Sequence, residues 1–96
     1  MIELDEVELE VLSLLLFPER FSKIVEESQK ANNEHVVADV LKNLLHKKLI
    51  VSGFMNENNE FKSSVFYDSD KMKRSAFKAS GKGIDFLQTA GENIND

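Results

Sequence analysis

The sequence contains no cysteine. Structural disulfides and sites with thiolate ligands are therefore excluded, and the fold must be held together by packing alone. It also lacks a hydrophobic run of membrane length, because the apolar block at residues 11–17 is short and contains Ser13, whereas a spanning helix needs about 20 apolar residues. The acidic N-terminal region predicts no signal peptide, so we expect a cytoplasmic location and no membrane partner.

Motifs of catalysis and cofactor binding are missing as well. The chain has no Gly-rich phosphate loop, nucleophile elbow or metal-ligand spacing. His35 and His46 lie on one predicted helix, but an axial rise of about 16 Å separates them, too far for a joint site. Asp68 and Asp70 form a lone Asp-x-Asp, which is far short of a calcium loop and more typical of a turn. We therefore expect no enzymatic activity, no metal and no cofactor.

Basic residues are fewer than acidic ones, with 12 Lys and Arg against 17 Asp and Glu and a net charge of -5. Because nonspecific attraction to phosphate depends on Lys and Arg, this balance argues against strong binding to nucleic acid. The imbalance is local, however: residues 1–30 carry eight acids and three bases, whereas residues 61–96 carry five acids and six bases. The local field matters more than the total, so the objection is weakened.

The composition is that of one folded domain spanning residues 1–96, with 42% apolar and 30% charged residues in a length that supports a single core. Hydrophobic periodicity predicts helices at about 3–17, 19–30 and 33–48. Pro18 ends the first helix or occupies the first position of the second. Alternating apolar residues then predict a wing at about 49–79 that contains a β-hairpin with a five-residue loop at 56–60. A short helix follows at about 80–90.

The region around which the chain is organised is residues 31–53. Its predicted helix has an apolar face, formed by Val36, Val37, Val40, Leu41, Leu44 and Leu45, and a polar face opposite. Directly after this helix, Leu49, Ile50 and Val51 begin a β-branched run typical of a strand. A helix that presents a polar face and leads straight into a strand is typical of a winged helix-turn-helix. The predicted fold is therefore α+β: a three-helical bundle with a β-hairpin wing and a short C-terminal helix.

The predicted first helix has two apolar faces. Leu4, Val7, Val11, Leu14 and Leu15 share one face, which is enough for a core contact. Leu9, Leu12 and Leu16 form a second face, which needs a cover. The cover is either the C-terminal helix of the same chain or a second subunit, and in the latter case these three leucines are the candidate interface of a homodimer.

Two segments resemble winged-helix regulators of the MarR and PadR families. Residues 40–50 (VLKNLLHKKLI) are similar to the helix ending of those families, an apolar-Leu-Lys-x-Leu pattern followed by Lys-Gly-Leu-Ile. Residues 79–87 (ASGKGIDFL) are similar to their Leu-Thr-x-x-Gly-x-x-x-Leu segment, which implies that Ser80 caps the last helix and that Gly83 permits a close approach. The resemblance covers residues 4–88 and implies a DNA-binding regulator, although one fold serves many functions.

The chain departs from the family pattern in three places. Lys48 stands where the families usually have a glycine that ends the helix in a left-handed conformation. The segment between Ile50 and Ser80 is longer than a short wing needs, so the wing is either long or contains an extra strand. The Asp-x-Arg of the wing tip has no counterpart, because Asp70 is followed two positions later by Met72. A wing-tip arginine therefore cannot be assigned.

The candidate DNA-binding residues come from the third helix and the wing. If the third helix lies in the major groove with its N-terminal half against the bases, its amide, imidazole and ammonium groups can contact base edges and phosphates. The candidates on the helix and the wing are Asn32, Asn33, His35, Lys42, Asn43, His46, Lys71, Lys73, Arg74 and Lys78. Glu34 and Asp39 project from the same helix face and would repel phosphate. The basic residues of the wing either hold phosphates or balance the acidic first helix.

These observations predict a cytoplasmic transcriptional regulator that binds duplex DNA as a homodimer, through the helix at about 33–48 and the wing. The alternative is a winged-helix module for protein–protein contacts, whose acidic surface repels nucleic acid. The sequence identifies no small-molecule effector.

Overall fold

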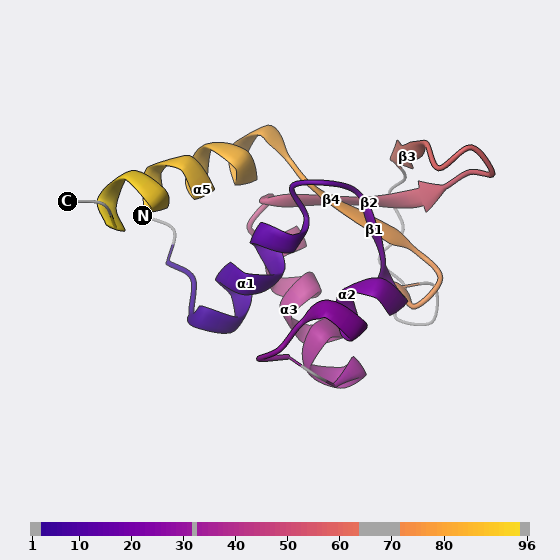
Figure 1. Cartoon of the computed structure of the whole chain (residues 1–96), viewed down its shortest axis with the longest axis horizontal. Coiled ribbons are helices and arrows are strands. Elements are labelled where there is room, and N and C mark those ends of the chain that lie inside the picture. Colours follow the sequence, from indigo (N-terminus) through magenta and orange to yellow (C-terminus); the bar gives the residue numbers. More distant parts are fainter. Residues whose placement is uncertain (1–2, 32, 64–71, 95–96) are drawn as a thin grey trace.

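The computed structural model describes residues 3–31, 33–63 and 72–94 (Figure 1). Within these ranges the chain forms four helices and an antiparallel sheet of four strands, and the predicted α+β class is confirmed. The elements are α1 (Glu6–Leu14), β1 (Glu19–Arg20), α2 (Phe21–Glu27), α3 (Glu34–His46), β2 (Ile50–Met55), β3 (Phe61–Ser63), β4 (Ala76–Ala79) and α5 (Gly81–Ile94). None of the helices in the described ranges is long and apolar enough to cross a membrane.

Helix α1 is shorter than predicted at both ends. It begins at Glu6 because a capping box satisfies its first donors: the Asp5 carboxylate accepts from the N–H of Glu8 at 2.8 Å, and the Glu8 carboxylate accepts from the N–H of Asp5 at 3.2 Å. It ends at Leu14. The next residue, Leu15, is hydrogen-bonded to the sheet, because its carbonyl accepts from the N–H of Ala79 in β4 at 2.8 Å.

Strand β1 was not expected, because residues 19–30 were predicted as one helix. Glu19 and Arg20 instead pair antiparallel with Phe77 and Ala76 of β4. The N–H of Phe21 adds a hydrogen bond of 3.1 Å to the Ser75 carbonyl, so α2 begins only at that residue. The partner strand is distant in sequence, and for that reason the local pattern could not show it.

Helix α3 matches its predicted core, and its end explains Lys48. The predicted Val37, Val40, Leu41, Leu44 and Leu45 are buried, whereas Val36 is exposed. At the C-terminus Lys48 has a φ of 62°, its N–H donates to the Leu45 carbonyl, and the N–H of Leu49 donates to the Leu44 carbonyl, both at 3.0 Å. This is a Schellman motif, with lysine in the left-handed position that glycine usually fills.

The region predicted to be the wing contains an additional strand, β4, beside the hairpin. Strands β2 and β3 form a hairpin, and the predicted loop at 56–60 is closed by hydrogen bonds of 3.0 Å from the N–H of Asn56 to the Glu60 carbonyl and from the N–H of Asn59 to the Asn56 carbonyl. Strand β4 then pairs with the other edge of β2, which gives the order β1-β4-β2-β3. Gly53 is required at the β2–β3 pairing, because a Cβ there would overlap the Lys62 carbonyl. Residues 64–71 lie outside the described part, Lys71 included.

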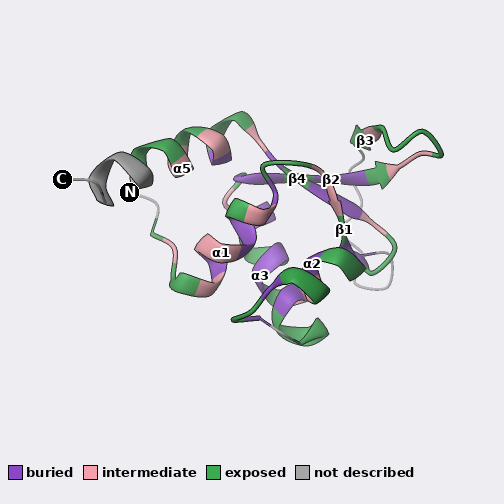
Figure 2. Cartoon of the chain, viewed as in Figure 1, coloured by how far each residue is buried: buried purple, intermediate pink, exposed green. Residues whose placement is uncertain are grey.

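The core lies between the sheet and the layer of α1, α2 and α3 (Figures 1 and 2). Ile50, Phe77 and Ala79 face the helices and are buried with Leu41 and Leu44, among others. The alternate strand residues face the other way: Val51 and Lys78, which are paired across β2 and β4, are exposed. The sheet therefore has one face packed against helices and a second face with exposed side chains.

Helix α5 begins at the corner where α3 meets β2. The Ser80 hydroxyl accepts from the N–H of Gly83 at 3.1 Å and donates to the Lys48 carbonyl at 2.8 Å. A Cβ on Gly83 would overlap the Leu49 carbonyl and lie 3.3 Å from Cδ1 of Leu12. The predicted cap at Ser80 and the predicted close approach at Gly83 are both confirmed.

The same contact corrects the predicted homodimer interface. Leu12 is fully buried within the chain and lies beside α5, so in this fold it is not available to a second subunit. Leu9 is half-buried and Leu16 is 46% exposed. The second apolar face of α1 is thus partly covered by the chain's own C-terminal helix, one of the two covers that the sequence left open.

Candidate nucleic-acid interface

The exposed face of α3 brings together most of the residues that were predicted on it. His35, Lys42, Asn43 and His46 are exposed, and at about 100° per residue their directions fall within an arc of roughly 100° around the helix axis, so they share one side of the helix. Asp39 is exposed between them. The face therefore offers imidazole, amide and ammonium groups around one carboxylate.

Asn33 has a structural role at the start of this face. Its side-chain oxygen accepts from the N–H of His35 at 2.7 Å and of Val36 at 3.4 Å, which caps α3. The side-chain NH₂ can still donate, but the bidentate adenine contact expected of an asparagine needs the oxygen too. Asn32 lies outside the described residues.

An ion pair joins the first turn of α3 to the turn that precedes β4. Lys73 Nζ lies 3.3 Å from a carboxylate oxygen of Glu34, and both side chains are more than half exposed. Such an exposed pair adds little stability, but it places Lys73 beside the N-terminus of α3 and offsets one of the two acids that opposed phosphate binding. Arg74, exposed next to Lys73, belongs to the same turn.

Lys78 does not belong with this group. It pairs with Val51 on the sheet face that points away from the helix layer, whereas α3 lies in that layer. The basic residues predicted for the wing therefore separate: Lys73 and Arg74 lie near α3, and Lys78 lies on the opposite side of the sheet.

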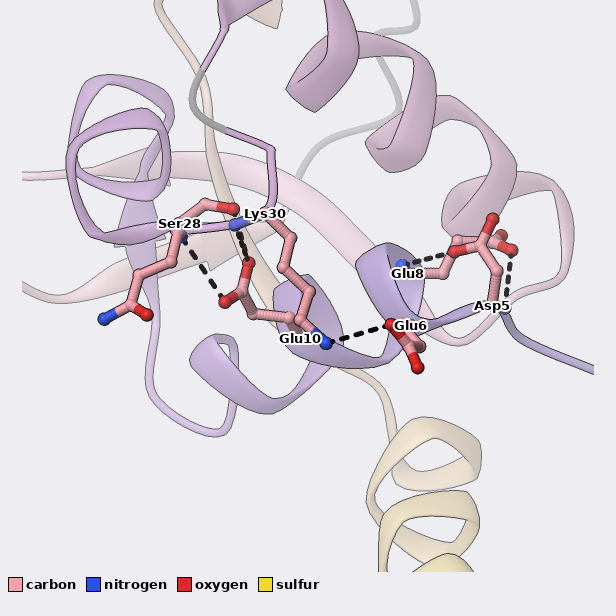
Figure 3. Close-up of polar contacts among 7 residues, drawn as sticks. Asp5, Glu6, Glu8, Glu10, Ser28 and Lys30 are labelled. Atoms are coloured by element: carbon pink, nitrogen blue, oxygen red, sulfur yellow. Dashed lines mark hydrogen bonds and ion pairs between the residues drawn. The ribbon is translucent and has the colours of Figure 1, made fainter.

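The acidic residues of α1 are occupied by internal contacts (Figure 3). Glu8 forms an ion pair of 3.0 Å with Lys47, and Glu6 forms one of 3.2 Å with Lys30. The carboxylate of Glu8 is almost fully buried. The buried Glu8 carboxylate thus contributes to holding α1 in place, whereas the Glu6–Lys30 pair is exposed and adds little stability.

Glu10 fixes the turn between α2 and α3. Its carboxylate accepts from the Ser28 hydroxyl at 2.7 Å and from the N–H of Lys30 at 3.0 Å (Figure 3). The Ser28 hydroxyl in turn accepts from the N–H of Ala31 at 3.0 Å. The hydrogen bonds from Ser28 and Lys30 hold the pKa of the Glu10 carboxyl below its usual range. Sequence reasoning missed this role, because no local pattern links α1 to residues 28–31.

A groove of about 460 Å³ lies at the C-terminal end of α3, lined by Lys42, Leu45, His46 and Lys48. We call it the cationic groove, because among the described residues no carboxylate lines it. Neither Lys42 nor Lys48 forms an ion pair with a residue in the described ranges. Lys48 was not among the predicted site residues. The one feature of the sequence that drew attention to it is that a lysine stands where a glycine is usual at a helix end.

In the part of the chain that the structure describes, no three His, Asp or Glu residues are grouped so that they could hold a metal ion. No protein-family model matches the chain, and no curated protein or solved structure matches it either. The case for function therefore rests on the geometry of the chain itself.

Proposed function

We propose that the chain is a winged helix-turn-helix domain, similar to the MarR and PadR regulators, that binds duplex DNA and regulates transcription in the cytoplasm. The observation that carries this proposal is α3: its apolar side is buried, its polar side is exposed, and hydrogen bonds of the buried Ser28 order the segment that follows α2. The β2–β3 hairpin and strand β4, which follow α3, fit the expected wing at about 49–79.

The exposed groups on α3 suit the major groove. Lys42 can reach guanine or phosphate, and Asn43 can pair with adenine through its side-chain amide. Lys73 and Arg74, near the N-terminus of α3, are suited to phosphate contacts that position the domain without reading sequence. The carboxylate of Asp39 can accept from the amino group of cytosine.

The regulator would act as a homodimer. Leu16 and Phe17 follow α1 and are 46% and 76% exposed, which makes them adjacent large apolar side chains on the surface. We expect a second copy of the chain to cover them, because helix-turn-helix dimers bind two half-sites of duplex DNA. Leu9 and Leu16 remain candidate interface residues in this proposal, and Leu12 does not.

Fluorescence anisotropy with mixed duplex fragments, at low and at moderate salt, tests the proposal. We expect binding that weakens steeply with salt, because exposed Lys and Arg side chains would displace counterions. Absence of binding even at low salt would overturn it.

The second candidate is a winged-helix module for protein–protein contacts without DNA binding. The observation in its favour is Asp39, an exposed carboxylate between His35 and Lys42 on the face that would meet phosphate. If no duplex binds at low salt, a pull-down with the wild-type chain as bait would detect the partner. The Asp39→Lys variant is the control and should lose it.

A further inference from the structure

The cationic groove gathers positive charge at one end of α3. Lys42 and His46 are four residues apart on the helix, so their side chains are neighbours, and Lys48 follows the helix end. Leu45, which is buried, supplies the apolar part of the wall. The nearest acid along α3 is the exposed Asp39, one turn before Lys42, and it does not line the groove.

Lys48 occupies its position in spite of its backbone conformation. A φ of 62° is unfavourable for a residue with a Cβ, and glycine is the usual residue at this point of a Schellman motif. The hydrogen bonds that end the helix use only backbone atoms, so glycine would make the same bonds. What lysine adds is a cation at the groove. Strained non-glycine residues of this kind concentrate at functional sites.

The groups in the groove select a particular kind of ligand. Two ammonium groups and an imidazole favour an anion with more than one negative charge, and lysine binds phosphate as a compact point charge. The volume of about 460 Å³ lies within the range of small-molecule sites, roughly 300–1,000 Å³. Inorganic phosphate alone would fill only a small part of this volume and would make no contact with Leu45.

We propose that the cationic groove binds a phosphorylated small molecule, with its phosphate held by Lys42, His46 and Lys48 and its organic part against Leu45. This inference goes beyond DNA binding, because it requires no duplex. A phosphate of the DNA backbone has the same chemistry, so the test must separate the two sources.

The test uses the backbone amide signals of residues 42–49 in NMR titrations with phenyl phosphate, inorganic phosphate and a short duplex, each at constant ionic strength. We expect saturable shifts with both free phosphates and tighter binding of phenyl phosphate. Lys48→Gly should weaken phenyl phosphate binding about tenfold without lowering the melting temperature. Lys48→Arg, which keeps the charge, should retain binding, and Lys78→Ala, on the far face of the sheet, should bind as the wild type does.

Three results would overturn the inference: no saturable shift with phenyl phosphate, equal affinity of Lys48→Gly and the wild type, or shifts in the groove with the duplex alone. Binding of phenyl phosphate without any binding of duplex would support the groove and contradict the DNA-binding proposal. The two proposals therefore fail by different outcomes.

Discussion

At the scale of single residues, Lys48 has a left-handed backbone conformation that is unfavourable for lysine. The left-handed conformation costs about 1–2 kcal/mol for a residue with a Cβ, and the helix end imposes it through two backbone hydrogen bonds. The sequence indicated that a glycine was missing here. It could not show that the lysine adopts the left-handed conformation that glycine usually adopts at this point of a helix end.

Lys48→Gly should therefore stabilise the fold. Relief of the left-handed conformation outweighs the extra chain entropy of glycine, and we expect a net gain of about 0.5–1 kcal/mol. Urea unfolding measures it. The same substitution at Lys42, inside α3, serves as the control and should cost about 1 kcal/mol; a loss of stability in Lys48→Gly would contradict the account of this helix end.

The two glycines at the start of α5 form a second matched pair. A Cβ on Gly83 would overlap the Leu49 carbonyl, whereas one on Gly81 would meet nothing within 4 Å. We expect Gly83→Ala to lose about 1–3 kcal/mol because α5 must move away from the α3–β2 corner. Gly81→Ala should be neutral or gain up to about 1 kcal/mol. Equal melting temperatures of the two variants would argue against this docking of α5.

At the scale of elements, α3 and the β2–β3 hairpin could be predicted because local patterns determine them. The apolar residues of α3 recur along one continuous segment, and the polar loop at 56–60 is also a single short segment, so both patterns are visible in the local sequence. Strand β1 could not be predicted, since Glu19 and Arg20 become a strand only through pairing with Phe77 and Ala76. The extent of α1 was overestimated for a similar reason: Leu15 bonds to Ala79 of the distant β4.

The turn between α2 and α3 gives a pH-dependent prediction. Because hydrogen bonds lower the pKa of Glu10 in the folded state from its ordinary value of 4.5, its carboxylate stabilises the fold above that pH, and this contribution is lost as the pH falls through the folded pKa. Glu10→Gln should thus be less stable than the wild type at neutral pH, and the difference should shrink as the pH falls below 4.5. Unfolding by urea at neutral and at acidic pH measures this; a difference that does not change with pH would refute the role of the ionised carboxylate.

At the scale of the whole molecule, the distribution of charge matters more than the net charge of -5. Glu8 and Glu10 are held in part-buried contacts within the chain, Glu6 forms an exposed ion pair with Lys30, and Lys73 lies beside α3. The sequence located the acidity in the first third but could not show that Lys73 and Lys78 lie on different sides of the sheet. Both placements depend on pairings between distant segments.

The proposed homodimer depends on the apolar surface at the end of α1. Leu16→Glu should leave a folded monomer, because Leu16 is 46% exposed and outside the buried core, and a charge there would disrupt a contact between two copies. Sedimentation equilibrium should show half the wild-type mass. A monomeric wild type, or an unchanged dimer in the variant, would contradict this interface.

DNA binding through α3 and the turn before β4 is the central claim, and the salt dependence of duplex affinity in Arg74→Gln and Lys78→Gln tests it most directly. Arg74 does not line the cationic groove and directly follows Lys73, whose ion pair with Glu34 lies at the start of α3, whereas Lys78 lies on the far face of the sheet. We predict that the slope of log affinity against log salt falls by about one unit in Arg74→Gln and stays unchanged in Lys78→Gln. Equal slopes in the wild type and both variants, or no binding at low salt, would contradict the claim.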